Sequence, residues 1–130
     1  MNFRLRTTAK TATILKDLQN STGLTPNYLA RIAIALSLQD PTSPKIVNGE
    51  TAGLEFNRNT LTGEFDQHYK FLIMMHANKS ISEEDYFPDL FNAHLERGAR
   101  ILDMEYKHAG NYDKLLNLFI NMVQENLEVK

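Results

Sequence analysis

The sequence predicts a mainly α-helical protein, and three observations support this prediction. Apolar residues recur at helical spacing over most of the chain, as they do on the buried face of a helix. Alternation of side-chain character, which indicates a strand, extends over residues 2–8, and only Leu54-Glu55-Phe56 could add a further short strand. Residues 39–52 combine proline, glycine, serine and threonine, which is typical of a long loop.

The chain has 130 residues, of which 42% are hydrophobic, and this suffices for one packed core. We therefore predict a single domain, residues 1–130, that consists of three parts. These parts are a basic segment at 1–38, a loop and a distinctive stretch at 39–60, and a helical extension at 61–130.

The net charge of −2 conceals a strong asymmetry along the chain. Residues 1–39 carry five cations and one acid, a balance of +4, whereas residues 40–130 carry nine cations and fifteen acids, a balance of −6. A basic segment on an acidic body can bind phosphate locally while the rest of the protein stays soluble.

The composition also excludes several classes of protein. There is no cysteine, which excludes disulfide frameworks, thiolate metal sites and a cysteine nucleophile, and is consistent with a reducing cytosol. No apolar run approaches the roughly 18 residues that a membrane span needs, and the N-terminus lacks a signal core. We expect a cytoplasmic protein without membrane contact.

Residues 2–8 predict a short basic strand with two different faces. One face consists of Phe3, Leu5 and Thr7, and the other of Asn2, Arg4, Arg6 and Thr8. A single strand leaves its backbone groups unpaired, so this one needs a second strand, either from this chain or from another copy.

Two helices are expected to follow the strand. Thr7 or Thr8 caps the first, which runs to about Asn20 and ends at Gly23 in a left-handed conformation. Thr25 and Pro26 then read as the N-cap and first position of a second helix. The second helix is apolar over much of its circumference, so we expect it to be buried against the first helix and a partner.

This order of strand, helix, glycine turn and helix is that of a ribbon-helix-helix protein. In that fold two chains pair their strands, and the resulting ribbon enters the major groove of DNA. Arginine can fork to guanine or phosphate, and a helix N-terminus offers N–H groups to phosphate. On this basis, the predicted DNA-binding residues are Arg4, Arg6, Lys10, Lys16, Thr25, Asn27 and Arg31. A dimer or tetramer of this chain is expected.

The remainder of the chain predicts three more helices. The first begins near residues 61–63 and runs to about Asn78, and the break at 80–85 has the capping character of a solvated helix entry. Pro88 opens the next helix, which ends at Gly110, and the last helix covers residues 111–126.

The stretch 53–66 mixes charged and apolar side chains, which suits a segment that is half buried between two layers. We expect Phe56, Leu61 and Phe65 to be buried here. We also expect Arg58 to bind two carboxylates, those of Glu55 and Glu64, because one guanidinium has donors for both.

Part of this stretch also carries a family resemblance. Asn57-Arg58-Asn59-Thr60-Leu61-Thr62-Gly63-Glu64, preceded by Phe56 and followed by Phe65-Asp66, resembles the signature of the DndE family of DNA sulfur-modification proteins. The resemblance extends to the length of the chain and to the opening Arg-Leu-Arg-Thr. The residues that we single out as the structural signature are Asn57, Arg58, Thr60, Leu61, Gly63 and Glu64.

The resemblance implies a role in DNA phosphorothioation, in which sulfur replaces a non-bridging phosphate oxygen. It implies an accessory subunit that binds double-stranded DNA and contacts other subunits of the modification complex. Sulfur delivery and nucleotide hydrolysis would be the work of those subunits, which are a cysteine desulfurase, an iron–sulfur protein and an ATPase.

The residues of this chain do not predict a reaction centre. Glu105 and His108 have the spacing of a di-iron motif, but such sites need a second copy of it, so we predict no metal and no cofactor. There is no phosphate-binding loop and no nucleophile elbow, so we predict no enzymatic activity for this chain by itself. Two alternative functions remain: a ribbon-helix-helix transcriptional repressor, and an assembly scaffold that does not contact DNA.

Overall fold

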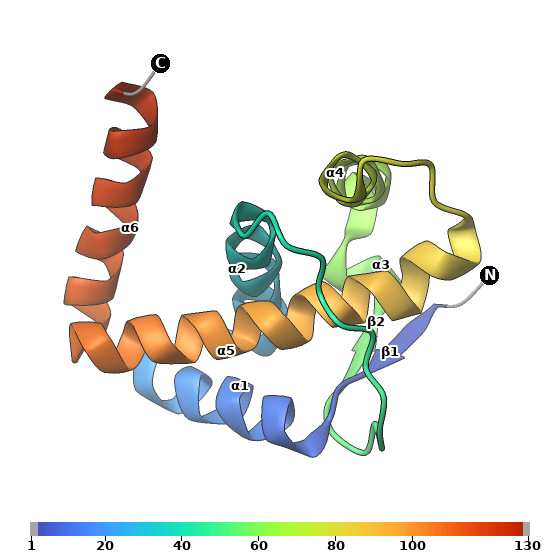
Figure 1. Cartoon of the computed structure of the whole chain (residues 1–130). Coiled ribbons are helices and arrows are strands. Elements are labelled where there is room, and N and C mark those ends of the chain that lie inside the picture. The colour runs from blue at the N-terminus through green and yellow to red at the C-terminus, as the bar shows by residue number, and fades with distance from the viewer. Residues whose placement is uncertain (1–2, 129–130) are drawn as a thin grey trace.

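The structure is a computed structural model that describes residues 3–128, with some side chains of the last helix left out. It is mainly helical, as predicted (Figure 1). The elements in chain order are β1 (Arg4–Arg6), α1 (Ala9–Thr22), α2 (Pro26–Gln39), β2 (Glu55–Asn57), α3 (Arg58–Leu61), the 3-10 turn η1 (Gly63–Phe65), α4 (Asp66–Ala77), the π-helical turn η2 (Asp85–Leu90), α5 (Phe91–Ala109) and α6 (Tyr112–Glu128). Within residues 3–128, none of the helices has the length and apolar character that a membrane span requires.

Helix α5 is the central support of the molecule. It runs across the middle of the fold and contacts α1, α2, η2 and α6 (Figure 1). Its closest contact is with α2, where a Cβ atom placed on Gly98 would overlap the carbonyl group of Ala33. The fully buried Ala30 and Ala99 keep the same crossing narrow. The partner that the apolar α2 was expected to need is therefore α5 of the same chain.

The predicted N-terminal strand exists, and its partner is β2 of the same chain. The two strands pair antiparallel, with Leu5 opposite Phe56 and Arg6 opposite Glu55. Leu5 and Phe56 are buried, while their neighbours along both strands face solvent. The expected inner position of Phe3 is wrong, because that side chain is exposed, and Asn2 lies outside the described residues. The strand–helix–helix order is thus present, but the prediction that a second chain supplies the paired strand is corrected.

The helix caps agree with the sequence for the first two helices. The hydroxyl of Thr8 accepts a hydrogen bond from the backbone N–H of Thr11, and Thr25 caps α2 in the same way. Gly23 ends α1 in the left-handed conformation, with φ at 78°. These signals are local, so the sequence predicts them well.

Two boundaries differ from the prediction. The helix expected from residues 61–63 is interrupted, because Gly63 adopts a positive φ of 56° and α4 starts only at Asp66. Pro88 lies within η2, after the extended Phe87, so α5 begins at Phe91. Proline lacks an N–H group and pushes the residue before it towards an extended conformation, which separates η2 from a regular helix start.

The contact at Gly98 gives a first testable prediction. Alanine normally stabilises an exposed helix interior by about 1 kcal/mol relative to glycine. Gly98→Ala is expected to reverse that sign and destabilise the protein by about 1–3 kcal/mol, because the added methyl group overlaps the α2 backbone. Gly49→Ala is the matched control, since a Cβ atom placed on Gly49 would meet no atom within 4 Å. Thermal and urea unfolding of both variants measure the difference, and equal stabilities would contradict the close crossing.

Candidate functional site

The signature stretch surrounds a buried arginine. Arg58 is 4% exposed and makes two parallel hydrogen bonds to Asp66, with Nε to Oδ1 at 3.0 Å and Nη2 to Oδ2 at 2.6 Å. The same Nη2 lies 2.5 Å from Oε1 of Glu83. Lys70 lies 3.2 Å from the other oxygen of Glu83, so two cations and two carboxylates form one neutral network.

Two aromatic rings complete the surroundings of Arg58. Its guanidinium carbon lies 5.2 Å from the ring centre of Tyr86 and 4.8 Å from that of Phe87, which are cation–π distances. The Tyr86 hydroxyl donates to Oδ1 of Asp66 at 3.1 Å, and the Thr62 hydroxyl lies 2.9 Å from the same oxygen. Both carboxylate oxygens of Asp66 are therefore fixed by donors.

The ionisation of these groups follows from their contacts. Burial raises the pKa of Asp66, but the hydrogen bonds from Arg58 and Thr62 outweigh it and hold that pKa below its ordinary value. Glu83 shows the same balance, with Arg58 and Lys70 lowering its pKa against the effect of burial. Burial and the neighbouring Asp66 raise the pKa of Tyr86, so its hydroxyl remains a hydrogen-bond donor at neutral pH.

Arg58 binds two carboxylates, as expected, but they are not those of Glu55 and Glu64. Phe56 points inward from the middle of β2, so its neighbour Glu55 points outward and pairs with Arg6 instead. Glu64 is exposed on η1, and Phe65 is 55% exposed rather than buried. The true partners are Asp66, at the start of α4, and Glu83, in the connection between α4 and η2. Glu83 belongs to the segment that was predicted to be a solvated helix entry.

The other signature residues shape the turn that holds Arg58. The side chain of Asn57 caps α3 by accepting from the N–H of Asn59 at 2.9 Å. Leu61 is fully buried, and Gly63 supplies the left-handed conformation at which α3 ends. The carbonyl groups of Thr60 and Leu61 accept hydrogen bonds from Arg31. Most of this set therefore acts in folding.

A second prediction concerns Arg58. Arg58→Ala leaves the partly buried Asp66 without its cation and Glu83 with Lys70 alone, so we expect a loss of up to about 3–5 kcal/mol of stability. Arg6→Ala removes an exposed pair with Glu55 and should cost under about 1 kcal/mol. Urea unfolding of the two variants provides the comparison. An Arg58→Ala protein with unchanged stability but lost function in modification would show that this arginine acts on a ligand instead.

The predicted DNA-binding residues fall into two groups in the structure. Arg4, Lys10 and Lys16 have exposed side chains without an ion pair among the described residues, and Arg6 is exposed beside Glu55. The other three lie at or near the first turn of α2. Thr25 is occupied in capping, Asn27 has a buried side-chain oxygen without a described partner, and Arg31 binds the backbone of α3.

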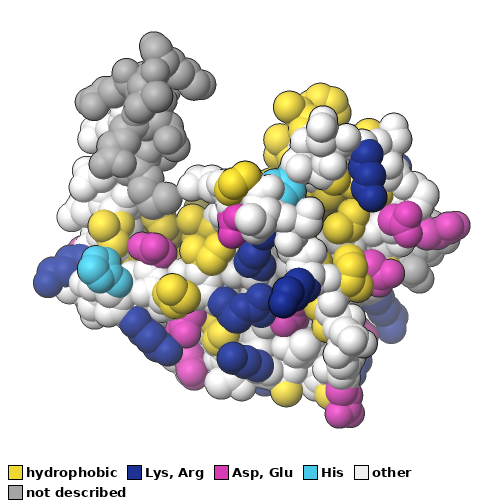
Figure 2. All heavy atoms as spheres, in the orientation of Figure 1, with side chains coloured by type: hydrophobic (Ala, Val, Ile, Leu, Met, Phe, Trp, Pro, Cys, Tyr) yellow, Lys and Arg dark blue, Asp and Glu magenta, His cyan; other side chains and the backbone are white. Residues whose placement is uncertain are grey.

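The cations of α5 were missed by the sequence analysis. Figure 2 shows Lys and Arg side chains gathered over the middle of α5 and the adjoining part of α1. Lys10 of α1 and Lys107 of α5 line one groove between these helices. The signal was present in the sequence: Arg97, Arg100 and Lys107 are spaced by three and seven residues, which places them on one side of a helix. They were overlooked because they belong to the acidic part of the chain.

A second polar cluster joins α2, α4 and α5. Ser37 and His94 are buried, with 2.8 Å between the Ser37 hydroxyl and Nδ1 of His94. Nε of Arg97 also donates to that hydroxyl, and its other nitrogens bind the carbonyls of Ser37 and Thr42. His76 donates from Nε2 to the carbonyl of Asp40 and meets His94 edge to face at 4.8 Å between ring centres. Burial, with His76 and Arg97 nearby, lowers the pKa of His94 to about 4.

This lowered pKa predicts a pH-dependent stability. His94 takes up a proton more readily in the unfolded chain than in the folded one. Its contribution to the free energy of unfolding is therefore complete above pH 6.5 and is lost as the pH falls towards about 4. Within that range the slope should approach about 1.4 kcal/mol per pH unit. Urea unfolding between pH 7 and pH 5 measures it, and His94→Gln, which cannot titrate, should have a shallower slope. Equal slopes would refute the buried neutral histidine.

Fold and side chains together define a small helical protein in which a buried ion network closes the turn after an N-terminal sheet. The family model described as "DNA sulphur modification protein DndE" matches residues 4–126. The chain belongs to the DndE family.

Solved structures give the same result. The chain is similar to the crystal structure of DndE from Escherichia coli B7A, which is involved in DNA phosphorothioation modification, with 26% identity and a TM-score of 0.61. That match covers 76% of this chain and 96% of the other. The fold is also similar to that of a DndE mutant involved in DNA phosphorothioation, with 23% identity, a TM-score of 0.60, and coverage of 78% and 97%. Comparison with curated proteins finds no match.

Proposed function

We propose that this protein is a DNA-binding accessory subunit of the phosphorothioation machinery and is not catalytic by itself. Membership of the DndE family supports a role in DNA sulfur modification. The observation that carries DNA binding is the gathering of Lys and Arg side chains over α1 and α5 (Figure 2). Cations brought together from distant parts of the chain are what a phosphate backbone requires.

The proposed phosphate contacts are the exposed cations Arg4, Arg6, Lys10 and Lys16, with Arg100 added from α5. Arg31 is left out, because two of its nitrogens donate to carbonyl groups of the chain. Arg97 is left out for the same reason. The N-terminus of α1 is also a poor phosphate site, because Glu96 accepts hydrogen bonds there from Thr8 and Thr11.

The proposed division of labour follows from the chemistry of sulfur transfer. Protein-bound sulfur is carried as a persulfide on a cysteine thiol, and this chain has no cysteine. Within residues 3–128, no cluster of three side chains could hold a metal ion either. The sulfur-carrying and nucleotide-hydrolysing steps are therefore assigned to other subunits, and this chain supplies contact with DNA and with those subunits.

Salt-dependent binding to a random DNA duplex tests the proposal. Each phosphate contact that is lost should reduce the slope of log K against log salt by about 0.9. Arg4→Gln combined with Arg6→Gln, and Lys10→Gln combined with Arg100→Gln, should each lower both affinity and slope. Lys114→Gln on α6 is the matched control and should change neither. If all variants bind with the wild-type slope, the proposed contacts are wrong.

The same titration separates the alternative functions. A transcriptional repressor would bind one operator far more tightly than random duplexes, whereas an accessory subunit should bind all duplexes with similar affinity. Duplexes with an interruption in one strand extend the comparison to DNA structure. A pure scaffold would bind none of these duplexes.

A specific observation favours the scaffold as a second candidate. Four large apolar side chains of η1 and α4 are exposed: Phe65 at 55%, Phe71 at 60%, Leu72 at 46% and Met75 at 62%. An exposed apolar surface of this kind marks a protein–protein interface. Strand β1 pairs with β2 and helix α2 packs on α5, so neither needs a second chain. The exposed apolar side chains of η1 and α4 are therefore the main argument for assembly with another copy or with another subunit.

The apolar surface of α4 leads to a prediction on assembly. Light scattering of the wild-type protein at micromolar concentration should report an even multiple of the chain mass. Phe71→Gln combined with Met75→Gln should shift the protein towards monomers while its melting temperature is unchanged, since both side chains are already in solvent. Leu116→Gln, on the exposed side of α6, tests whether any surface leucine has the same effect. A wild-type monomer would leave only another subunit as the partner.

A further inference from the structure

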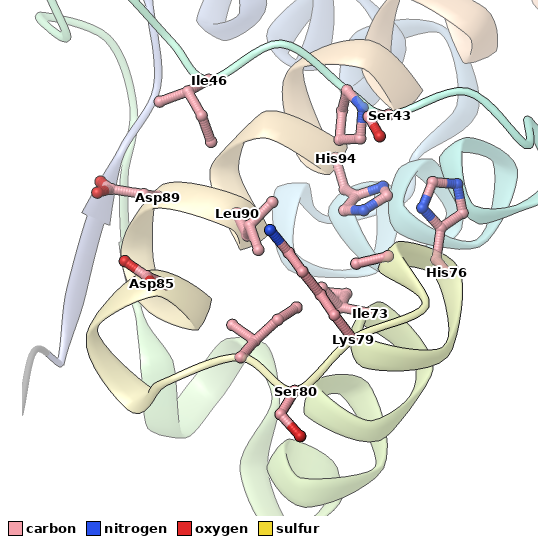
Figure 3. A pocket seen from close by; sticks show the side chains of 13 residues that line it. Ser43, Ile46, Ile73, His76, Lys79, Ser80, Asp85, Asp89, Leu90 and His94 are labelled. Carbon is pink, nitrogen blue, oxygen red and sulfur yellow. The ribbon is translucent and has the colours of Figure 1, made fainter.

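A cavity of about 520 Å³ lies between the loop after α2, the C-terminal end of α4, and the helices η2 and α5. Figure 3 shows His76 and His94 at one end of it, Asp85 and Asp89 at the other, and Lys79 reaching in between. The volume is in the range of small-molecule sites. Neither the proposed DNA contacts nor the Arg58 network uses it.

His94 presents an unpartnered donor at this cavity. The buried Ser37 hydroxyl accepts from Nε of Arg97, and Nδ1 of His94 is the only described acceptor for its own proton. Nδ1 therefore carries no proton, and the proton of the neutral imidazole is on Nε2. The His94 side chain is 1% exposed and lines the cavity, and no described residue accepts from Nε2. An N–H group without an acceptor at the wall of a cavity indicates a site for a ligand oxygen.

The charges around the cavity define the ligand further. Lys79, Asp85 and Asp89 all line it, and none of them forms an ion pair within 4.0 Å among the described residues. An anion alone would meet two carboxylates, and a cation alone would meet the charge of Lys79 and leave the His94 donor without an acceptor. A ligand that carries both charges satisfies both ends.

The walls select an aliphatic body. Ile73 and Ile81 are buried in the floor, and Leu90 is half buried beside them. Apart from the two histidines, no aromatic ring lines the cavity, which disfavours a stacked base. Pro44 and Ile46 of the covering loop lie on the other side.

Residues 43–52 of this loop form no hydrogen bond with the rest of the described chain, so the loop can open without breaking one.

We propose that this cavity binds a zwitterionic aliphatic amino acid or a short peptide with free termini. The carboxylate accepts hydrogen bonds from Nε2 of His94 and from Lys79, the ammonium group faces Asp85 and Asp89, and the aliphatic side chain lies on Ile73 and Ile81. Single amino acids and peptide termini share this chemistry, and the experiment distinguishes them.

Titration of the full chain with leucine and with leucyl-leucine, followed by backbone amide chemical shifts in NMR, tests the proposal. Shifts confined to residues 43–52, 76–81 and 85–94 are expected, with the stronger of the two probes identifying an amino acid or a peptide. N-acetyl-leucine lacks the ammonium group and leucinamide lacks the carboxylate, so each should bind at least about tenfold more weakly. Absence of local shifts with both parent probes up to about 10 mM would overturn the proposal.

Surface variants assign the two ends without disturbing the core. Lys79→Gln should weaken leucine at least about tenfold but leave leucinamide unchanged, whereas Asp85→Asn combined with Asp89→Asn should have the opposite selectivity. Lys114→Gln, remote from the cavity, is the control for charge. If Lys79→Gln weakened leucine and leucinamide equally, the carboxylate would not be at Lys79 and the proposed orientation would be wrong.

Discussion

The fold depends most on the buried guanidinium of Arg58. It lies where the N-terminal sheet passes into the helical extension, and its backbone N–H donates to Phe3 beside β1 at 2.7 Å. Its side chain binds Asp66 at the start of α4 and Glu83 just before η2. One cation thus fixes the relative positions of three segments that are far apart in the sequence. Its charge is balanced by carboxylates and aromatic faces, so burial costs less than it would for an isolated ion.

Helix α5 performs the corresponding task for the two N-terminal helices, through polar groups at successive positions. Glu96 accepts three hydrogen bonds from Thr8 and Thr11, which holds the start of α1. Arg97 binds carbonyl groups at the end of α2, and Gly98 allows α2 to approach closely. Helix α5 is therefore largely buried although its sequence is charged at positions 96 and 97. Its Glu96 and Arg97 are structural groups, whereas cations further along, such as Arg100, remain exposed for a partner.

The sequence predicted what depends on near neighbours and missed what depends on distant ones. The caps Thr8 and Thr25, the left-handed Gly23 and the inward Leu5 follow from local geometry. That Arg58 binds two carboxylates followed from its donors, but the identity of the partners did not, because Glu83 is brought to it only by the path of α4. Chain-long charge balance was similarly misleading. The charge balance placed the expected DNA-binding cations within residues 1–39. In the folded protein, Lys and Arg side chains also gather over the middle of α5, next to those of α1 (Figure 2).

The loop between α2 and β2 connects these structural features to the two proposed sites. It is fixed at its start by Arg97, which binds Thr42, and at its end by Gly53 and Leu54, whose N–H groups bind Thr7. Between these anchors it covers the cavity at His94. The groove of Lys10 and Lys107 shares no residue with that cavity, although both are built on α5. A ligand in the cavity would therefore not compete with DNA on the proposed contacts at Lys10 and Arg100. Helix α5 is the element that both sites share, and its close contact with α2 at Gly98 makes it a packed connection between them.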